Sequence, residues 1–242
     1  MTATFLELGH HGRMSNGMFQ IAATIGYAKK YNVPFCFPKW EHQSLFNIPN
    51  EYFIDSNLIC VYSNYNEPKY TYSEIPFQNS CSLSGYFQSW KYFEHCKCYI
   101  DELLCPTITE DLSEYCCVHV RRGDYLRFPE HHPIQNIDYY MRAAGNIPTK
   151  KFMVFSDDIE WCKHNFTGNE FTFNDTSSAA DDFRRMVSCS SFIIANSSFS
   201  WWAAWLGKSQ HKIVIAPKNW FGPALKKTHP IHDLIPEQWK II

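Results

Sequence analysis

The chain has 242 residues, 45% of them hydrophobic, which is enough for one large domain or two smaller ones with apolar cores. Its formal net charge of −2 argues against a nucleic-acid partner or bulk attraction to an anionic membrane. No apolar run reaches the roughly 18 residues of a membrane span, and the N-terminus does not resemble a signal peptide. We therefore expect a soluble, cytoplasmic chain. The alternative is a lumenal location with an upstream anchor.

The first half begins as an α/β unit. Residues 4–8 read as a strand, followed by a glycine-bearing turn and a helix over residues 18–31. A second strand is expected at residues 33–38. Residues 40–80 show little periodicity, and residues 82–93 recover a strand and the start of a helix.

The second half alternates strands and helices, which is typical of right-handed βαβ units in a parallel sheet. The halves are expected to be two facing α/β domains, residues 1–110 and residues 111–242. The strands expected in the second domain are residues 115–120, 151–156, 171–173, 191–196 and 212–217, and the helices are residues 137–145, 159–166, 179–190 and 198–207.

Ligands of such sheets bind beyond the carboxyl ends of the strands. Four polar residues end or directly follow expected strands: Arg121, Asp157, Asn196 and Ser197. We expect them to line one crevice, although they lie up to 76 residues apart in the sequence.

The stretch HVRRGD, residues 119–124, carries the clearest chemistry. A guanidinium bonds two phosphate oxygens at once and stays charged, and Asp124 is spaced to orient Arg121. Two alternatives remain open. One is a surface salt-bridge cluster, and the other is an Arg-Gly-Asp adhesion site, which needs a long exposed loop.

Three further stretches are candidates for a site. Ser197 and Ser198 stand at a strand-to-helix junction, which suits either an anion or a simple helix cap. Asp157 and Asp158 could bind a metal, bind a guanine or cap the next helix. The sequence alone favours the helix cap. The turn at residues 12–17 offers two long polar groups, Arg13 and Asn16.

The ten cysteines read mostly as buried small side chains in a reducing compartment. Four of them are close enough in the sequence for disulfide pairing to stay an alternative: Cys81, Cys96, Cys98 and Cys105.

Taken together, the motifs resemble those of the α-1,2-fucosyltransferases, an inverting family that moves L-fucose from GDP-fucose onto a sugar hydroxyl. Four stretches match in order: GRMSNGMFQ from Gly12, GYFQS from Gly85, HVRRGDY from His119, and SDD from Ser156 followed by ANSSFSWWAAWL from Ala195. The resemblance implies a GT-B-like fold, in which two Rossmann-like domains with parallel sheets face each other across a cleft. It also implies that the activity needs neither a metal nor another cofactor.

The resemblance also implies roles for matched positions. Arg121 holds the β-phosphate of the leaving group, supported by Arg122, and Asn16 completes the catalytic set. Residues 1–110 form the acceptor-side domain and residues 111–242 the GDP-fucose domain. The implied donor-binding residues are His119, Arg121, Asp124, Asp157, Asp158, Asn196, Ser197, Ser198 and Phe199, and those on the fucose and acceptor side are Arg13, Asn16 and Gln88.

The expected reaction is transfer of fucose to a glycan hydroxyl, O2 of a terminal galactose or a similar residue. A different linkage, or a non-catalytic nucleotide- or sugar-binding relative, is the alternative. The family pattern G-G-x-G-N-Q is altered here, because Ser15 precedes Asn16 and Gly17 follows it. The sequence leaves the general base open among Glu7, His11 and Asp124.

Overall fold

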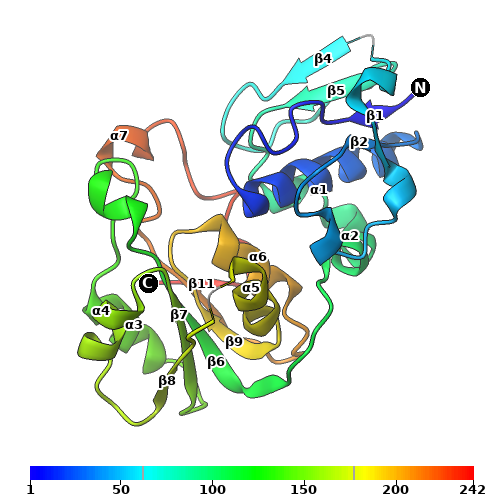
Figure 1. The fold of residues 1–242 in the computed structure, drawn as a ribbon. Coiled ribbons are helices and arrows are strands. Elements are labelled where there is room, and N and C mark those ends of the chain that lie inside the picture. The colour runs from blue at the N-terminus through cyan, green and yellow to red at the C-terminus, as the bar shows by residue number, and fades with distance from the viewer. Residues whose placement is uncertain (62, 177) are drawn as a thin grey trace. The chain divides into compact units, whose positions relative to one another are not determined.

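The computed structural model describes the whole chain except residues 62 and 177, and the chain forms two compact units (Figure 1). Unit 1 comprises Met1–Thr107 and Thr228–Pro236, and unit 2 comprises Ile108–Lys227 and Glu237–Ile242. The chain first passes from one unit to the other near the expected boundary at residue 110. Residues 228–236 were expected in the second domain, whereas in the structure they pack in unit 1.

Asp233 fixes this returning segment in unit 1. Its carboxylate is buried and accepts hydrogen bonds from the backbone N–H of Tyr72 at 2.9 Å and from Lys91 Nζ at 2.5 Å. Burial opposes ionisation, but the bonds from Lys91 and Tyr72 outweigh it and lower the pKa of Asp233. Both contacts join residues more than 140 positions apart, which local sequence patterns do not reveal.

Unit 2 is built on a six-stranded parallel sheet in the order β11-β10-β9-β6-β7-β8. This is the doubly wound order, in which the chain direction across the sheet switches between β6 and β9. The predicted alternation of strands and helices is confirmed, and among the strands of this sheet only β11, at its edge, was not predicted. The strands are β6 (Leu112–Val120), β7 (Phe152–Ser156), β8 (Phe171–Phe173), β9 (Cys189–Ile193), β10 (Val214–Ala216) and β11 (Lys240–Ile241).

The four longer helices of unit 2 start at side-chain caps. Asn136, Asp158, Ser178 and Ser197 each accept a hydrogen bond from a backbone N–H in the first turn that follows. Figure 1 shows α3 and α4 on one face of the sheet and α5 and α6 on the other. The helices are α3 (Ile137–Ala144), α4 (Ile159–Asn165), α5 (Ala179–Val187), α6 (Ser198–Leu206) and the short α7 (Pro223–Lys226).

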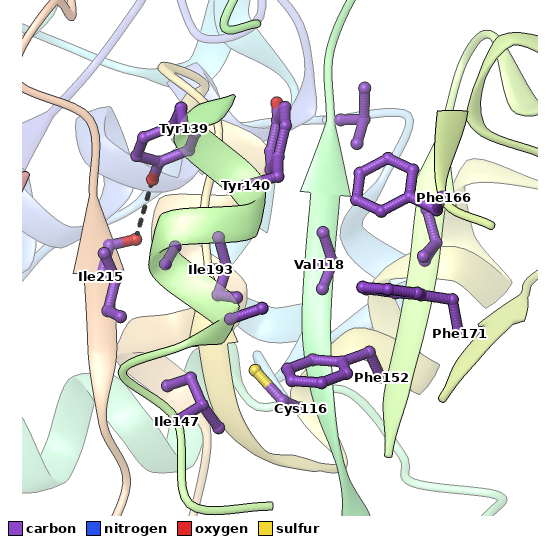
Figure 2. Close-up of a cluster of buried hydrophobic side chains, with 14 of the residues drawn as sticks. Cys116, Val118, Tyr139, Tyr140, Ile147, Phe152, Phe166, Phe171, Ile193 and Ile215 are labelled. Atoms are coloured by element: carbon purple, nitrogen blue, oxygen red, sulfur yellow. Dashed lines mark hydrogen bonds between the residues drawn. The ribbon is translucent and has the colours of Figure 1, made fainter. Parts of the chain in front are cut away.

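Helix α3 covers the middle of the sheet with two tyrosines (Figure 2). Tyr140 packs its ring against Phe166 at 5.7 Å, and Tyr139 donates its hydroxyl proton to the carbonyls of Ile194 at 2.7 Å and Ile215 at 3.2 Å. The Tyr139 bonds connect the ends of β9 and β10 beneath the helix. This core therefore holds the carboxyl ends of the central strands in a fixed arrangement.

Unit 1 has a smaller parallel sheet in the order β1-β5-β4 and a two-stranded sheet, β2-β3. The long α1 (Met14–Tyr31) begins four residues earlier than predicted, and α2 (Lys97–Leu104) follows later in the chain. The strands are β1 (Ala3–Thr4), β2 (Phe37–Pro38), β3 (Phe53–Ile54), β4 (Ser63–Asn66) and β5 (Cys81–Ser84).

The strand predicted at residues 4–8 is wrong in extent. The chain turns directly after β1, because the N–H of Leu8 bonds the carbonyl of Phe5 and Gly9 adopts a positive φ of 83°. Strand β4 lies in the stretch where no element was predicted. All ten cysteines are free thiols. Across the described residues, none of the helices combines the length and the apolar character needed to cross a bilayer.

Candidate functional site

The strongest candidate site of unit 2 lies where β6 and β9 run side by side, with Val118 opposite Ile193. The stretch HVRRGD follows β6 and the stretch ANSS follows β9. Both stretches therefore leave the carboxyl edge of the sheet at the position where the strand order switches, the usual ligand position in doubly wound sheets.

Arg121 is held in place by two carboxylates. Its Nη2 lies 2.5 Å from Asp124 Oδ1, and its Nη1 lies 2.9 Å from Asp157 Oδ2. Its Cζ is 5.4 Å from the ring centroid of Tyr125, and the side chain is 19% exposed. A guanidinium has five N–H donors, so donors remain for a phosphate that approaches this preoriented fork.

Arg122 points to a different neighbour. Its Nε donates to Asp158 Oδ2 at 2.9 Å, and its backbone N–H donates to Asp157 Oδ1 at 2.8 Å. The guanidinium also covers the ring of Trp161 in α4. Arg122 thus anchors the loop to α4, whereas Arg121 is held by Asp124 and Asp157.

The resemblance implies that Asp157 and Asp158 bind the donor, and in this structure their carboxylates hold the two arginines. Asp158 also caps α4 by accepting a bond from the N–H of Trp161 at 3.3 Å. Gly123 allows Asp157 to come close, since a Cβ at that position would lie 2.3 Å from Asp157 Oδ2. The glycine of HVRRGD therefore serves loop packing, and both ends of its Arg-Gly-Asp triplet are paired within the protein.

His119 is a buried polar group of the site. It is 6% exposed, its ring lies 5.7 Å from that of Phe199, and its Nδ1 has no hydrogen-bond partner in the described structure. Burial, reinforced by the charge of Arg121, lowers the pKa of His119 to about 3. A neutral ring with an unpartnered nitrogen is the kind of buried group that a ligand satisfies.

Asn196 was expected to face the ligand, but its side chain is turned inward. It is 2% exposed, and its Nδ2 donates to the carbonyls of Pro133 at 3.0 Å and Trp220 at 2.9 Å. Its Oδ1 accepts a bond from Gln135 Nε2 at 3.2 Å. Both amide hydrogens are used, so Asn196 shapes the loops around the site. Gln135 was not singled out from the sequence, and no motif marks it.

The start of α6 supplies two hydroxyls at the same edge. Ser197 accepts a bond from the N–H of Phe199 at 3.3 Å, which makes it the helix cap, and Ser198 is half-buried beside it. The predicted cap at this junction is confirmed. Trp201 and Trp202, which follow in α6, are fully buried.

Unit 1 has its own polar cluster at the carboxyl edge of its sheet. Gln88 Nε2 donates to Asn16 Oδ1 at 2.9 Å, and the Tyr70 hydroxyl donates to Gln88 Oε1. The Tyr70 ring in turn lies 4.3 Å from the ring of His229 in the returning segment. Arg13 is exposed just before α1. The structure thus joins Asn16 and Gln88, which lie 72 positions apart in the sequence.

Glu67 supports the GYFQS stretch of unit 1 and was missed by the sequence analysis. Its Oε2 accepts bonds from the backbone N–H groups of Tyr86 at 2.8 Å and Phe87 at 3.0 Å. Burial raises the pKa of Glu67, and these two bonds oppose the rise. Because Glu67 follows β4, in the stretch without visible periodicity, nothing in the sequence pointed to it.

Comparisons with known proteins agree with this arrangement. Residues 21–240 match the family model described as Glycosyl transferase family 11. The O-antigen biosynthesis glycosyltransferase WbnK of Escherichia coli is 37% identical over 43% of this chain and 38% of its own length. The alpha-1,2-colitosyltransferase of Escherichia coli is 29% identical over 80% of both chains. The galactoside 2-alpha-L-fucosyltransferase SEC1 of Bos taurus is 27% identical over 81% of this chain and 62% of its own length.

Two solved structures share the fold. Fucosyltransferase NodZ from Bradyrhizobium superposes with a TM-score of 0.52, covering 78% of this chain and 88% of its own, and POFUT1 in complex with GDP with 0.50, covering 89% and 97%. Both are 11% identical to this chain, so the likeness concerns architecture alone. The expected α/β, GT-B-like class is confirmed.

Proposed function

From the premise that the chain belongs to glycosyl transferase family 11, we propose that it moves L-fucose from GDP-fucose to a hydroxyl of a glycan acceptor, with inversion at the transferred carbon. The resemblance to the α-1,2-fucosyltransferases is confirmed by this family match, and the chain is a glycosyltransferase. The identities of the donor, the acceptor and the linkage go beyond the family match and are our proposal.

The observation that carries the proposal is the fork of Arg121, fixed between Asp124 and Asp157 at the switch point of the sheet. When the bond from fucose to the diphosphate breaks, negative charge grows on the β-phosphate. A preoriented guanidinium stabilises that charge more in the transition state than in the ground state, which raises the rate. A positive arginine supplies what a metal supplies elsewhere, so we propose a transfer without metal.

The remaining donor contacts follow from the same edge of the sheet. We assign the unpartnered Nδ1 of His119 to the nucleoside. The hydroxyls of Ser197 and Ser198 at the start of α6 are placed for phosphate oxygens, a common use of a helix start. Phe199 packs against the His119 ring on the same side of the sheet edge.

For the acceptor we propose O2 of a terminal galactose, on the support of the relatives named as galactoside 2-alpha-L-fucosyltransferases. The polar cluster of Asn16 and Gln88, with Arg13 beside it, is assigned to the sugar side. A second candidate is transfer of colitose in place of fucose, which the match to a colitosyltransferase over four fifths of both chains favours.

Calorimetric titration of GDP into the protein in the presence of EDTA tests the donor assignment, with UDP and ADP as controls. We expect micromolar binding of GDP and none of the other two. Absence of GDP binding, or binding that requires a divalent metal, would contradict the proposal. Linkage analysis of the product formed from GDP-fucose and lactose then tests the acceptor assignment, and GDP-colitose as the donor tests the second candidate.

A further inference from the structure

The loop between β1 and α1 carries a carboxylate–imidazole pair that the proposed function leaves unused. Glu7 Oε2 lies 3.0 Å from His11 Nε2 and accepts a 2.7 Å hydrogen bond from Ser84 Oγ. Ser84 ends β5, the strand beside β1, so the pair is tied to the carboxyl edge of the sheet. The side chains of His11 and Glu7 are nevertheless 41% and 50% exposed, so a substrate can reach them.

An exposed aromatic ring lies beside this pair. The ring centroids of His11 and Tyr86 are 6.2 Å apart, and Tyr86 is 41% exposed. The backbone of Tyr86 is fixed by its bond to Glu67. A flat apolar face of this kind suits the C–H face of a sugar ring, and the imidazole stands at its side.

The other carboxylates of the candidate sites are already engaged. Asp124 is bound to Arg121, and Glu67 holds two backbone N–H groups. Hydrogen bonds from Ser84 and His11 lower the pKa of Glu7, so this carboxylate itself holds a proton weakly. Among the three bases that the sequence leaves open, His11 is the one with both a partner that orients it and access to a ligand.

We propose that His11 is the general base of the transfer and that Glu7 is its positioning residue, an inference that rests on the proposed function. With the Nε2 proton directed at Glu7, the lone pair of Nδ1 is available to the acceptor, and the carboxylate stabilises the imidazolium that forms.

The step balances in atoms and charge. The acceptor hydroxyl gives its proton to Nδ1 of His11, and its oxygen forms the new bond to fucose C1. The bond from C1 to the β-phosphate oxygen breaks, and both electrons leave with GDP. His11 then releases its proton to solvent.

The test compares His11→Gln, which forms hydrogen bonds but accepts no proton, with His10→Gln at the exposed neighbouring histidine. GDP release from GDP-fucose is measured with and without lactose, and GDP affinity is measured by calorimetry. We expect His11→Gln to lower kcat by about 10²-fold or more, with GDP affinity unchanged, and His10→Gln to behave as wild type. Glu7→Gln should lower kcat by less and leave the KM for GDP-fucose unchanged.

Chemical rescue separates catalysis from packing. Imidazole added to His11→Ala should restore part of the lost rate and should do nothing for Arg121→Ala. A His11→Gln variant that keeps the wild-type kcat would overturn the inference and leave the proposed function intact. A wild-type chain that neither binds GDP nor releases it from GDP-fucose would overturn the proposed function, and the inference with it.

Discussion

Arg122 lies over the indole of Trp161, with its Cζ 4.1 Å from the ring centroid. The same guanidinium donates from Nε to Asp158, the residue that caps α4. The two adjacent arginines therefore have different partners, because Arg122 is bound to α4 while Arg121 is paired with Asp124 and Asp157.

We expect Trp161→Ala to lower the free energy of unfolding by about 1–3 kcal/mol, since it removes the cation–π contact and the packing of the ring on Phe166. Trp161→Phe keeps a ring under Arg122 and should cost less. Urea denaturation of both variants checks the order. Equal stability of the two would show that the contact with Arg122 contributes nothing.

Arg121→Ala should reduce the rate of GDP release from GDP-fucose by at least about 10²-fold, the usual effect of removing one preorganised charge partner. Arg121→Lys should restore little, because one ammonium cannot reproduce the fork that spans two oxygens. The control is Arg127→Ala, an exposed arginine six positions along the same loop. An Arg121→Ala enzyme as fast as wild type would refute the phosphate assignment.

His119 makes stability depend on pH. Burial and the charge of Arg121 lower its pKa in the folded chain from 6.5 to about 3. Between these values the unfolded chain binds a proton that the folded chain does not, so the free energy of unfolding falls as the pH falls through this window. When the pH is lowered from 7 to about 4.5, we expect the free energy of unfolding to fall less for His119→Gln than for wild type, as measured by urea denaturation.

The matched control for this comparison is the exposed His211→Gln, which should follow the wild-type pH dependence. A parallel pH dependence for His119→Gln and wild type would mean that His119 titrates normally in the folded chain.

Two glycines of α1 should respond differently to alanine. A Cβ at Gly26 would lie 2.1 Å from the carbonyl oxygen of Tyr92, a backbone atom that cannot turn aside. A Cβ at Gly17 would lie 3.0 Å from the ring of Trp40, which is buried and stacked on Phe46. We expect Gly17→Ala to lower the free energy of unfolding by about 1–3 kcal/mol and Gly26→Ala to lower it by more.

Thermal and urea unfolding measure the stability of the two alanine variants. The same measurement on Gly17→Ala combined with Trp40→Phe should show part of the lost stability restored, because the ring of phenylalanine is smaller. Gly17 stands where the family pattern has glutamine, so the same comparison with Gly17→Gln tests whether Trp40 accounts for the departure. A Gly17→Gln chain as stable as wild type would contradict that explanation.

The architecture of unit 2 could be predicted because local signals agreed with the tertiary structure. Its central strands are continuous apolar runs, and residues such as Asn136 and Asp158 mark where helices begin. Strand β4 (SNYN) and the exposed edge strand β11 (KI) carry no such signal. Their strand conformation depends on pairing with partners that are distant in the sequence.

The site was predictable to the level of its segments and not of its side chains. The position of HVRRGD after a buried strand and the pairing of Arg121 with Asp124 agree with the expectation. The inward turn of Asn196 and the reach of Asp157 to Arg121 depend on rotamers and on loops from elsewhere in unit 2. A sequence pattern specifies neither.

The return of Thr228–Pro236 to unit 1 has a consequence for how the protein is made. During synthesis the first 107 residues emerge early, but the carboxylate that binds Lys91 and the backbone of Tyr72 leaves the ribosome only after most of unit 2. Unit 1 therefore stays incomplete until Asp233 has been translated, against the usual order in which N-terminal domains finish first. Neither unit can be obtained by cutting the gene at one point.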